Sequence, residues 1–218
     1  MPFSQAPNLV VALARITPSG GALIGTAVAL GGRKFATAFH VTGADDSNLV
    51  IVVPRIGSMQ DYQDTSDDKL ATARARIVAS DPLHDLCILD VDAQVQVGYT
   101  IGSTDDVPPG MPVVTFGFPH AETGRFVLTQ QDTKVGARIL VDSSGIKSKH
   151  IVLNTQARPG QSGGPVFTAA PPFKLIAVLV GSYAPGGGGG ISLGGIDPHT
   201  LHQTTHAVSA EYLLGMLK

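Results

Sequence analysis

Cysteine, tryptophan and charge are scarce in this sequence. Its 218 residues include one cysteine, Cys87, and no tryptophan, and only 15% of them are charged. A single cysteine excludes an intramolecular disulfide framework, and a formal net charge of −2 leaves no electrostatic footprint for nucleic acid or anionic lipid. No run approaches the ~18 apolar residues of a membrane span. We therefore expect a hydrophobic core to supply the stability, and we expect neither a nucleic-acid nor a membrane partner.

The N-terminal stretch, MPFSQAPNLVVALARI, lacks the basic start and the small-residue cleavage site of a secretory signal. Cys87 lies in the apolar run LCILDV, where we expect it to be a small buried hydrophobic residue. A chain that folds without disulfides suits a reducing compartment. We therefore expect a cytoplasmic protein, unless an upstream segment is missing from the sequence.

Short runs rich in valine, isoleucine, leucine and threonine recur along the chain, separated by clusters of glycine, proline, aspartate and serine. Long helical periodicity is nearly absent, except in SAEYLLGMLK, which predicts a short C-terminal helix capped by Ser209. The predicted strands are Leu9–Ile16, Ala22–Leu30, Lys34–Phe39, Leu49–Val53, Ala71–Ala79, Leu86–Val91, Pro112–Phe116, Phe126–Val135, Ile151–Thr155, Pro165–Phe167, Leu175–Val180 and Thr205–Val208.

The segment Asp92–Gly110 has few strand signals and contains a Pro-Pro-Gly stop. It divides the predicted strands six and six, so it marks a boundary between two antiparallel lobes. Many short strands with frequent turns favour barrels or a sandwich over alternating βα units. We therefore predict an all-β protein with one unit over residues 1–95 and a second over residues 96–218.

Three short motifs together supply the groups that acyl transfer to a serine needs. Such chemistry requires a nucleophile with a base, an acid that orients the base, and donors for the developing oxyanion. His40 ends the apolar strand of KFATAFHVTG, and Asp85 opens the apolar strand of HDLCILDV. Ser162 lies among the glycines of PGQSGGP. Gly160 lets the backbone bend so that the amides of Gly160 and Ser162 point to one spot, as an oxyanion hole requires.

Two of these assignments have rivals nearby in the sequence. His84 is the main rival for the base, although it should project to the opposite side of its strand from Asp85. The orienting acid has three competitors, Asp81, Asp90 and Asp92.

The run DPHTLHQTTH suggests a metal hypothesis, because His199, His202 and His206 could gather on one helical turn. Pro198 and the paired threonines favour a loop instead, and no carboxylate or cysteine completes a shell. We therefore expect neither a metal nor a cofactor.

Read together in the order His, Asp, Ser, the motifs resemble those of the chymotrypsin-like (trypsin-fold) serine peptidases. The matching pieces are TAFHVTG, HDLCILDV and PGQSGGPVF. The resemblance runs from about Gly25 to the final helix and is closest to the disulfide-poor branch with HtrA-type and glutamyl-endopeptidase-like enzymes. It implies two six-stranded antiparallel β-barrels with the site in the cleft between them. It also implies an endopeptidase acting on protein or peptide substrates, with His40 as base, Asp85 as its orienter and Ser162 as nucleophile.

The chain departs from the digestive members of this family at its activation machinery. Gln161 stands where those members use an aspartate to receive a freed N-terminus, and there is no Ile-Val-Gly-Gly start. We therefore expect no activation by N-terminal cleavage. The oxyanion hole should be preformed, or gated by a partner or by the glycine-rich segment Pro185–Gly190.

The resemblance also suggests where the primary specificity pocket lies. Its expected walls are Gln156, Ala157, Val180 and Ser182. No acidic residue falls at the base of the pocket, and no histidine stands where glutamate-specific members place one. We therefore expect a small, apolar or polar uncharged side chain in the pocket.

Two other functions compete with the peptidase reading. GQSGG also fits G-x-S-x-G, the nucleophile elbow of α/β-hydrolase esterases, but that fold needs a helix after the serine, and Gly-Gly-Pro-Val-Phe starts a helix poorly. The other is a protease-like fold without catalysis, used as a binding or regulatory module. Its members usually lose a triad residue, whereas all three are present here.

Overall fold

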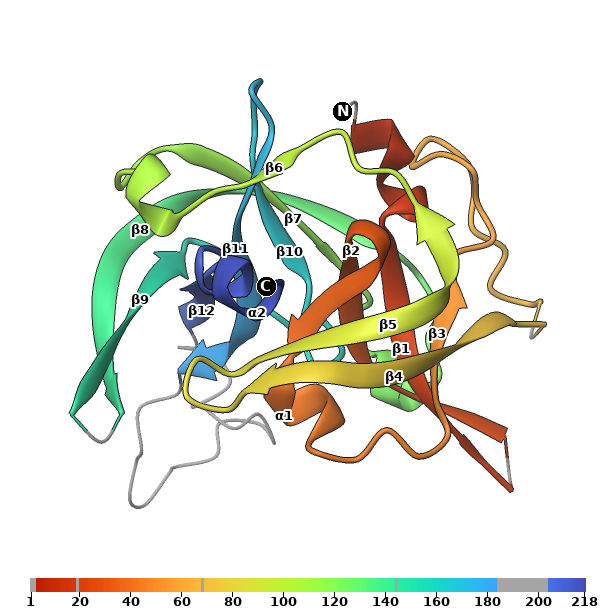
Figure 1. Cartoon of the computed structure of the whole chain (residues 1–218). Helices are drawn as coiled ribbons and strands as arrows, with labels where there is room; N and C mark the ends of the chain where they lie inside the picture. Colours follow the sequence, from red (N-terminus) through yellow and green to blue (C-terminus); the bar gives the residue numbers. More distant parts are fainter. Residues whose placement is uncertain (1–2, 19, 68, 144, 184–203) are drawn as a thin grey trace, which may run out of the picture.

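Strands dominate the computed structural model, which describes residues 3–18, 20–67, 69–143, 145–183 and 204–218 (Figure 1). Helices are short and lie at the ends of strands or in connections. They are the 3₁₀ helices η1 (Phe3–Asn8), η2 (Thr104–Asp106) and η3 (Ala121–Thr123), and the α-helices α1 (Phe39–Thr42) and α2 (Tyr212–Met216).

The first barrel closes in the order β1-β2-β5-β4-β3, with antiparallel pairing throughout. The first half of β2 pairs with β1 and its second half pairs with β5, on either side of Gly31 and Gly32, which both have positive φ. The long strand therefore serves as two barrel segments, which makes six in all. The strands are β1 (Val10–Thr17), β2 (Gly20–Ala38), β3 (Leu49–Val53), β4 (Ala71–Asp81) and β5 (Leu86–Val95).

The second sheet also closes, because β10 pairs with both β7 and β11. Six antiparallel strands, β7 to β12, form this barrel, and the short β6 adds to β11 in parallel. The predicted all-β class with two antiparallel barrels is confirmed. The strands are β6 (Thr100–Ile101), β7 (Pro112–Gly117), β8 (Thr129–Ser143), β9 (Ile146–Leu153), β10 (Pro165–Thr168), β11 (Lys174–Tyr183) and β12 (Thr204–Ser209).

The two barrels pack against each other along β1 and β2, which contact β7, while β2 also contacts β11. Residues 26–29 of β2 are buried without alternation, because both faces of the strand are covered there. Because the single cysteine forms no disulfide, burial of apolar side chains in the barrels and between them is the main term that stabilises the fold. Cys87 is fully buried on β5, as predicted, and burial raises the pKa of its thiol.

Helices η1 and α2 each pack on the barrel to which their own part of the chain does not belong. Phe3 in η1 lies 5.7 Å from Phe116 and 5.2 Å from Phe173, measured between ring centres, on the second barrel. At the other end, α2 contacts β4 and β5 of the first barrel, and the ring of Tyr212 stacks on His84 at 3.7 Å. These crossed contacts help to fix the barrels relative to each other. The division of the chain into units 1–95 and 96–218 stays a prediction.

Some details differ from the sequence-based expectation. The two strands predicted over Ala22–Leu30 and Lys34–Phe39 form the single strand β2, and β6 was not predicted. The helix at the C-terminus is present, but Ser209 is the last residue of β12 and does not cap it; its hydroxyl instead accepts the N–H of Thr104 at 3.1 Å. The β8–β9 hairpin is also longer than expected, and the part of it beyond the predicted strands, residues 136–143 and 146–150, consists mainly of half-exposed and exposed residues. In the part of the chain that the structure describes, no helix is long and apolar enough to span a membrane.

Candidate active site

His40 sits where β2 ends and turns into the single-turn helix α1. Its ring Nδ1 lies 2.6 Å from Oδ2 of Asp85, and its backbone N–H donates to Oδ1 of the same carboxylate at 2.8 Å. About half of the imidazole remains accessible, with the His40 side chain 46% exposed and that of Asp85 29%. The carboxylate therefore fixes the ring through one nitrogen and leaves Nε2 available for a substrate or a nucleophile.

Asp85 occupies an unusual backbone conformation at the start of β5. Its φ is +55°, in the left-handed region that aspartate tolerates better than most residues. Its carbonyl accepts the N–H of Phe39 at 3.0 Å, so the residue binds the His40 segment through both backbone and side chain. Such strain persists only where surrounding contacts enforce it, and it gathers at active sites.

The loop that carries Ser162 packs directly on β2. The carbonyl of Ser162 accepts the N–H of Thr26 at 2.9 Å. Gly163 has φ +85°, and a Cβ there would overlap the oxygen atoms Thr26 O and Thr37 Oγ1 and lie 3.1 Å from the backbone N of Ala38. The half-buried Ser162 thus lies in a loop that touches β2 just before His40. The structure brings the three predicted segments together, and the catalytic roles of the three residues stay predictions.

Gly160 adopts φ +90°, and a side chain there would collide with the carbonyl of Phe118 and with Ala121. Its carbonyl accepts the hydroxyl of Thr26 at 2.8 Å. Within the described residues, the amides of Gly160 and Ser162 donate no hydrogen bond. Two unused N–H groups flanking one residue are suited to receiving an anion.

Gln161 is fully buried between these two amides and carries no charge. Its side-chain oxygen accepts the N–H of Arg158 at 2.7 Å, and its NH₂ group donates to Gln131 on β8 at 3.1 Å. Both ends of the amide are therefore satisfied inside the protein, as a buried polar group requires. In this chain the neighbour of the serine is held by neutral hydrogen bonds instead of an ion pair.

The expected pocket walls converge on a residue that the sequence did not single out. Thr205 is fully buried on β12, and its hydroxyl donates to the carbonyl of Thr155 at 2.6 Å and accepts the N–H of Ala157 at 2.7 Å. In the sheet Thr205 pairs with Ser182 of β11. Thr205 thereby joins the segment with Gln156 and Ala157 to the strand with Val180 and Ser182.

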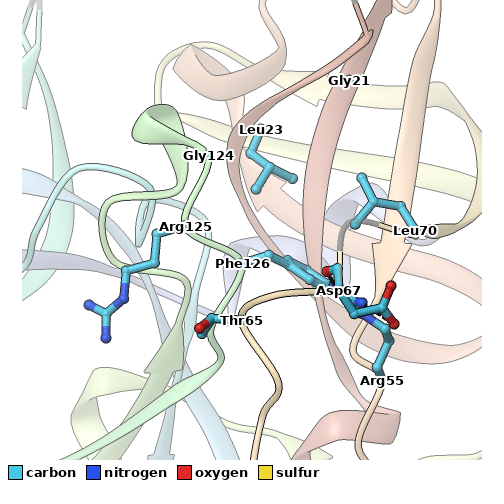
Figure 2. A pocket seen from close by; sticks show the side chains of 9 residues that line it. All are labelled: Gly21, Leu23, Arg55, Thr65, Asp67, Leu70, Gly124, Arg125 and Phe126. Atoms are coloured by element: carbon cyan, nitrogen blue, oxygen red, sulfur yellow. Dashed lines mark hydrogen bonds and ion pairs between the residues drawn. The ribbon is translucent and has the colours of Figure 1, made fainter.

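A cavity of about 210 Å³ lies between residues of the first barrel and the segment that follows η3 (Figure 2). Gly124 of its lining directly follows η3, whose Ala121 lies next to the Gly160 position. In Figure 2, Leu23 and Leu70 face Phe126, with the ion pair of Arg55 and Asp67 beside the ring. The lining consists of Gly21, Leu23, Arg55, Thr65, Asp67, Leu70, Gly124, Arg125 and Phe126.

The rival residues are engaged elsewhere. His84 forms its own pair with Asp81, with Nδ1 and Oδ2 2.6 Å apart. Asp90 and Asp92 both bind Arg33. Among the described residues, no hydrogen bond or ion pair joins any of these groups to the serine loop.

The remaining metal and gating hypotheses fall largely on residues 184–203. His199, His202 and the segment Pro185–Gly190 lie outside the described residues, whereas His206 is described on β12. Among the described residues, no three histidine, cysteine, aspartate or glutamate side chains gather in a way that would hold a metal ion.

Comparison with known proteins shows which family the two-barrel chain belongs to. Residues 25–178 match the sequence profile of the trypsin-like peptidase domain. The chain belongs to this family. The matched range of the trypsin-like peptidase domain contains His40, Asp85 and Ser162, and with the two closed barrels it rules out the α/β-hydrolase alternative.

Two curated relatives come from the HtrA branch. A probable periplasmic serine endoprotease, DegP-like, of Rickettsia prowazekii is 28% identical over 112 residues, which cover 51% of this chain and 21% of the relative. A serine protease Do-like HtrA of Lactobacillus helveticus is 29% identical over 100 residues, covering 45% of this chain and 24% of the relative. This chain therefore matches only about a quarter or less of the length of these relatives.

A solved structure of the HtrA-type protease AlgW with a tripeptide has the same fold. Its TM-score is 0.68 at 21% identity, over 98% of this chain and 60% of that one. The expectation of a cytoplasmic location is wrong, because the periplasmic relative points to an extracytoplasmic one. Missing disulfides were a poor guide, since a sufficient core stabilises a fold in any compartment.

Proposed function

We propose that this chain is a serine endopeptidase that cleaves peptide bonds with Ser162 as nucleophile, His40 as base and Asp85 as the acid that orients it. The observation that carries the proposal is the contact of 2.6 Å between Nδ1 of His40 and Asp85, next to a serine loop that packs on the histidine strand. Membership of the trypsin-like peptidase family supports the same assignment.

In the proposed reaction, Oγ of Ser162 attacks the scissile carbonyl while Nε2 of His40 takes the hydroxyl proton. The carboxylate of Asp85 holds the ring in position and stabilises the imidazolium that forms. The N–H groups of Gly160 and Ser162 receive the oxyanion of the tetrahedral intermediate. His40 then gives its proton to the leaving amine, and a water molecule, activated by the same ring, hydrolyses the acyl-enzyme.

We further propose that the enzyme needs no N-terminal cleavage to become active. Gln161 is neutral, buried and hydrogen-bonded at both ends of its amide, so the loop needs no new ammonium group to hold it. The unused amides of Gly160 and Ser162 support a hole that is formed before substrate binds.

The substrates we propose are peptides, since a structural neighbour of the same fold holds a tripeptide. Gln156, Ala157, Val180 and Ser182 would line the pocket for the residue before the scissile bond. Because none of these four side chains carries a charge, an uncharged residue should be preferred there.

A fluorophosphonate probe tests the proposal, because it labels only an activated serine. The purified chain with its N-terminus intact, as verified by mass spectrometry, should be labelled, and Ser162→Ala should not. Ser148→Ala is the matched control, since that hydroxyl is bound to His150 on β9, and it should label normally. Absence of labelling in the wild-type chain would instead favour a catalytically silent binding module. Labelling only after proteolytic trimming would contradict the preformed hole alone.

A further inference from the structure

Thr26 is a fully buried residue of β2 whose hydrogen bonds converge on the serine loop. Its backbone N–H donates to Ser162 O at 2.9 Å, and its hydroxyl donates to Gly160 O at 2.8 Å. The hydroxyl oxygen also accepts the N–H of Phe118 at 3.3 Å. One hydroxyl is a donor and an acceptor at once, so both of its contacts can be satisfied together.

Hydrogen bonds hold the carbonyls of four successive residues in the serine loop. The Pro159 carbonyl accepts the N–H of His120 at 2.7 Å, and the Gln161 carbonyl accepts that of Gly164 at 2.9 Å. The other two carbonyls, those of Gly160 and Ser162, are the ones that Thr26 holds. Because each peptide group is planar, a held carbonyl fixes the N–H of the next residue. The held carbonyls of Pro159 and Gln161 therefore fix the amides of Gly160 and Ser162, and the held carbonyl of Gly160 fixes the peptide plane that lies between them.

Thr26 also connects this loop to the arm that ends in His40. Its carbonyl accepts the hydroxyl of Thr37 at 2.7 Å. Thr37 lies in the second half of β2, three residues before His40, which follows the strand in α1. The residue therefore touches the strand of the proposed base with its carbonyl and the loop of the proposed nucleophile with its amide and hydroxyl. Nothing else among the described residues donates to the Gly160 carbonyl.

We infer that Thr26 is a positioning residue of the oxyanion hole: its hydroxyl holds the Gly160–Gln161 peptide plane, which joins the planes of the Gly160 and Ser162 amides, and so keeps the two amides directed together at the developing charge. The inference rests on the proposed function. Glycine at position 160 has no side chain to restrict its rotation, so the hydrogen bond from Thr26 supplies the restraint. Thr26 does not touch the reacting atoms, and its effect should appear mainly in the transition state.

The test is hydrolysis of p-nitrophenyl acetate, whose acylation and turnover can be followed without knowledge of the natural substrate. Thr26→Val keeps the shape and removes the hydroxyl, and Thr26→Ser restores it. We expect Thr26→Val to lower the acylation rate at least ~10-fold and to change KM by no more than about twofold, which is the pattern of a lost transition-state interaction. Thr26→Ser should keep an acylation rate within about threefold of wild type.

The matched control is Thr168→Val. The Thr168 hydroxyl is also buried and also joins two backbone groups, Pro172 O at 3.1 Å and Lys174 N at 3.0 Å, but on β10. This variant should lower the melting temperature and leave acylation unchanged. An equal acylation rate in Thr26→Val and wild type would overturn the inference, as would a loss that Thr26→Ser fails to rescue.

The pH profile separates the hole from the base. If Thr26→Val perturbs only the hole, the limb of the acylation profile that reports the base keeps its midpoint, and a shifted midpoint would overturn the assignment because the histidine arm would have moved. Should Thr26→Val not fold, Thr26→Ala is judged by the same criteria. Wild-type acylation that survives Ser162→Ala would sink the proposed function itself, whereas failure of Thr26→Val alone would leave that function standing.

Discussion

Two aspartate–histidine pairs of nearly equal local geometry lie at the same end of the first barrel. In Asp85–His40 and in Asp81–His84 alike, Nδ1 and Oδ2 are 2.6 Å apart and the second carboxylate oxygen accepts the backbone N–H of the histidine. Their surroundings differ. The His84 side chain is 14% exposed and its ring is stacked on Tyr212, whereas His40 is 46% exposed and stands beside the serine loop.

The same hydrogen bond thus occurs in the proposed catalytic pair and in a second pair, so the bond alone does not distinguish them. Asp81–His84 is a local pair within one turn, three residues apart, whereas Asp85–His40 joins residues 45 apart and exists only because β2 and β5 meet in the barrel. A base needs a second nitrogen that faces a reacting group. His84 uses its ring to hold α2 on the barrel, and His40 keeps its ring available.

Replacing each of the two histidines by alanine should give the largest difference in kcat between the two pairs. His40→Ala should lower kcat by about 10⁶-fold, because triad members act as a unit. His84→Ala should change kcat less than threefold and lower the melting temperature. Steady-state hydrolysis and thermal unfolding measure the two effects, and comparable losses of kcat in both variants would refute the distinction.

Neutralising the two carboxylates gives the next largest contrast. Asp85→Asn should lower kcat about 10⁴-fold, since the amide cannot stabilise the imidazolium or hold the correct tautomer. Asp81→Asn should leave kcat nearly unchanged. The measurement is steady-state hydrolysis of p-nitrophenyl acetate at pH 7.5. A strong loss in Asp81→Asn would mean that the local pair also serves the reaction.

A buried histidine lies within electrostatic reach of both pairs and should make stability depend on pH. Burial lowers the pKa of His150 from 6.5 to about 4. The neighbouring His206 and His84 also lower this pKa, and Asp85 opposes the shift. The unfolded chain binds this proton first, so the free energy of unfolding should fall as pH drops from about 6.5 to about 4.

Urea titrations between pH 7 and pH 4.5 would measure this loss of stability. His150→Gln should lose less stability than wild type over the interval, and His120→Gln, at an exposed position, should behave as wild type. A wild-type loss that His150→Gln reproduces in full would place the proton uptake on another group.

The smallest expected effect concerns the aromatic ring that closes the local pair. Tyr212→Phe keeps the stacked ring and removes the hydroxyl that accepts the N–H of Lys149 at 2.8 Å. It should cost about 1 kcal/mol, or ~2–4 °C in melting temperature, with unchanged activity. Tyr212→Leu, which also removes the ring, should cost more. Calorimetry measures both, and a loss of activity in Tyr212→Phe would show that His84 is not isolated from the reaction.

Much of the fold could be predicted, because the residue pattern that marks a strand is contained within the strand itself. β3, β7 and β10 were found within a residue or two from their apolar runs and flanking turns. The β8–β9 hairpin was underestimated, since residues 136–143 alternate between half-buried and exposed positions and their apolar run, Ile139–Val141, is too short to predict a strand of this length. The cap assigned to Ser209 failed because β12 continues to that residue.

At the candidate site, the sequence indicated the three segments that the structure brings together, and the catalytic roles of their residues stay predictions. Gly160 and Gly163 stand at positive φ where no side chain fits, which is the physical reason for the glycines around Ser162. Thr26 and Thr205 carried no signal, because threonine is common in strands and their partners are remote. The hydroxyl of Thr26 reaches a carbonyl 134 residues away.

By itself, the sequence determined the strands and three chemical groups, because side-chain alternation and glycine's freedom act over a few residues. Only the tertiary structure decided which aspartate holds which histidine and which carbonyls of the serine loop are held in place. Those choices depend on barrel closure and burial, which bring together groups that are far apart along the chain.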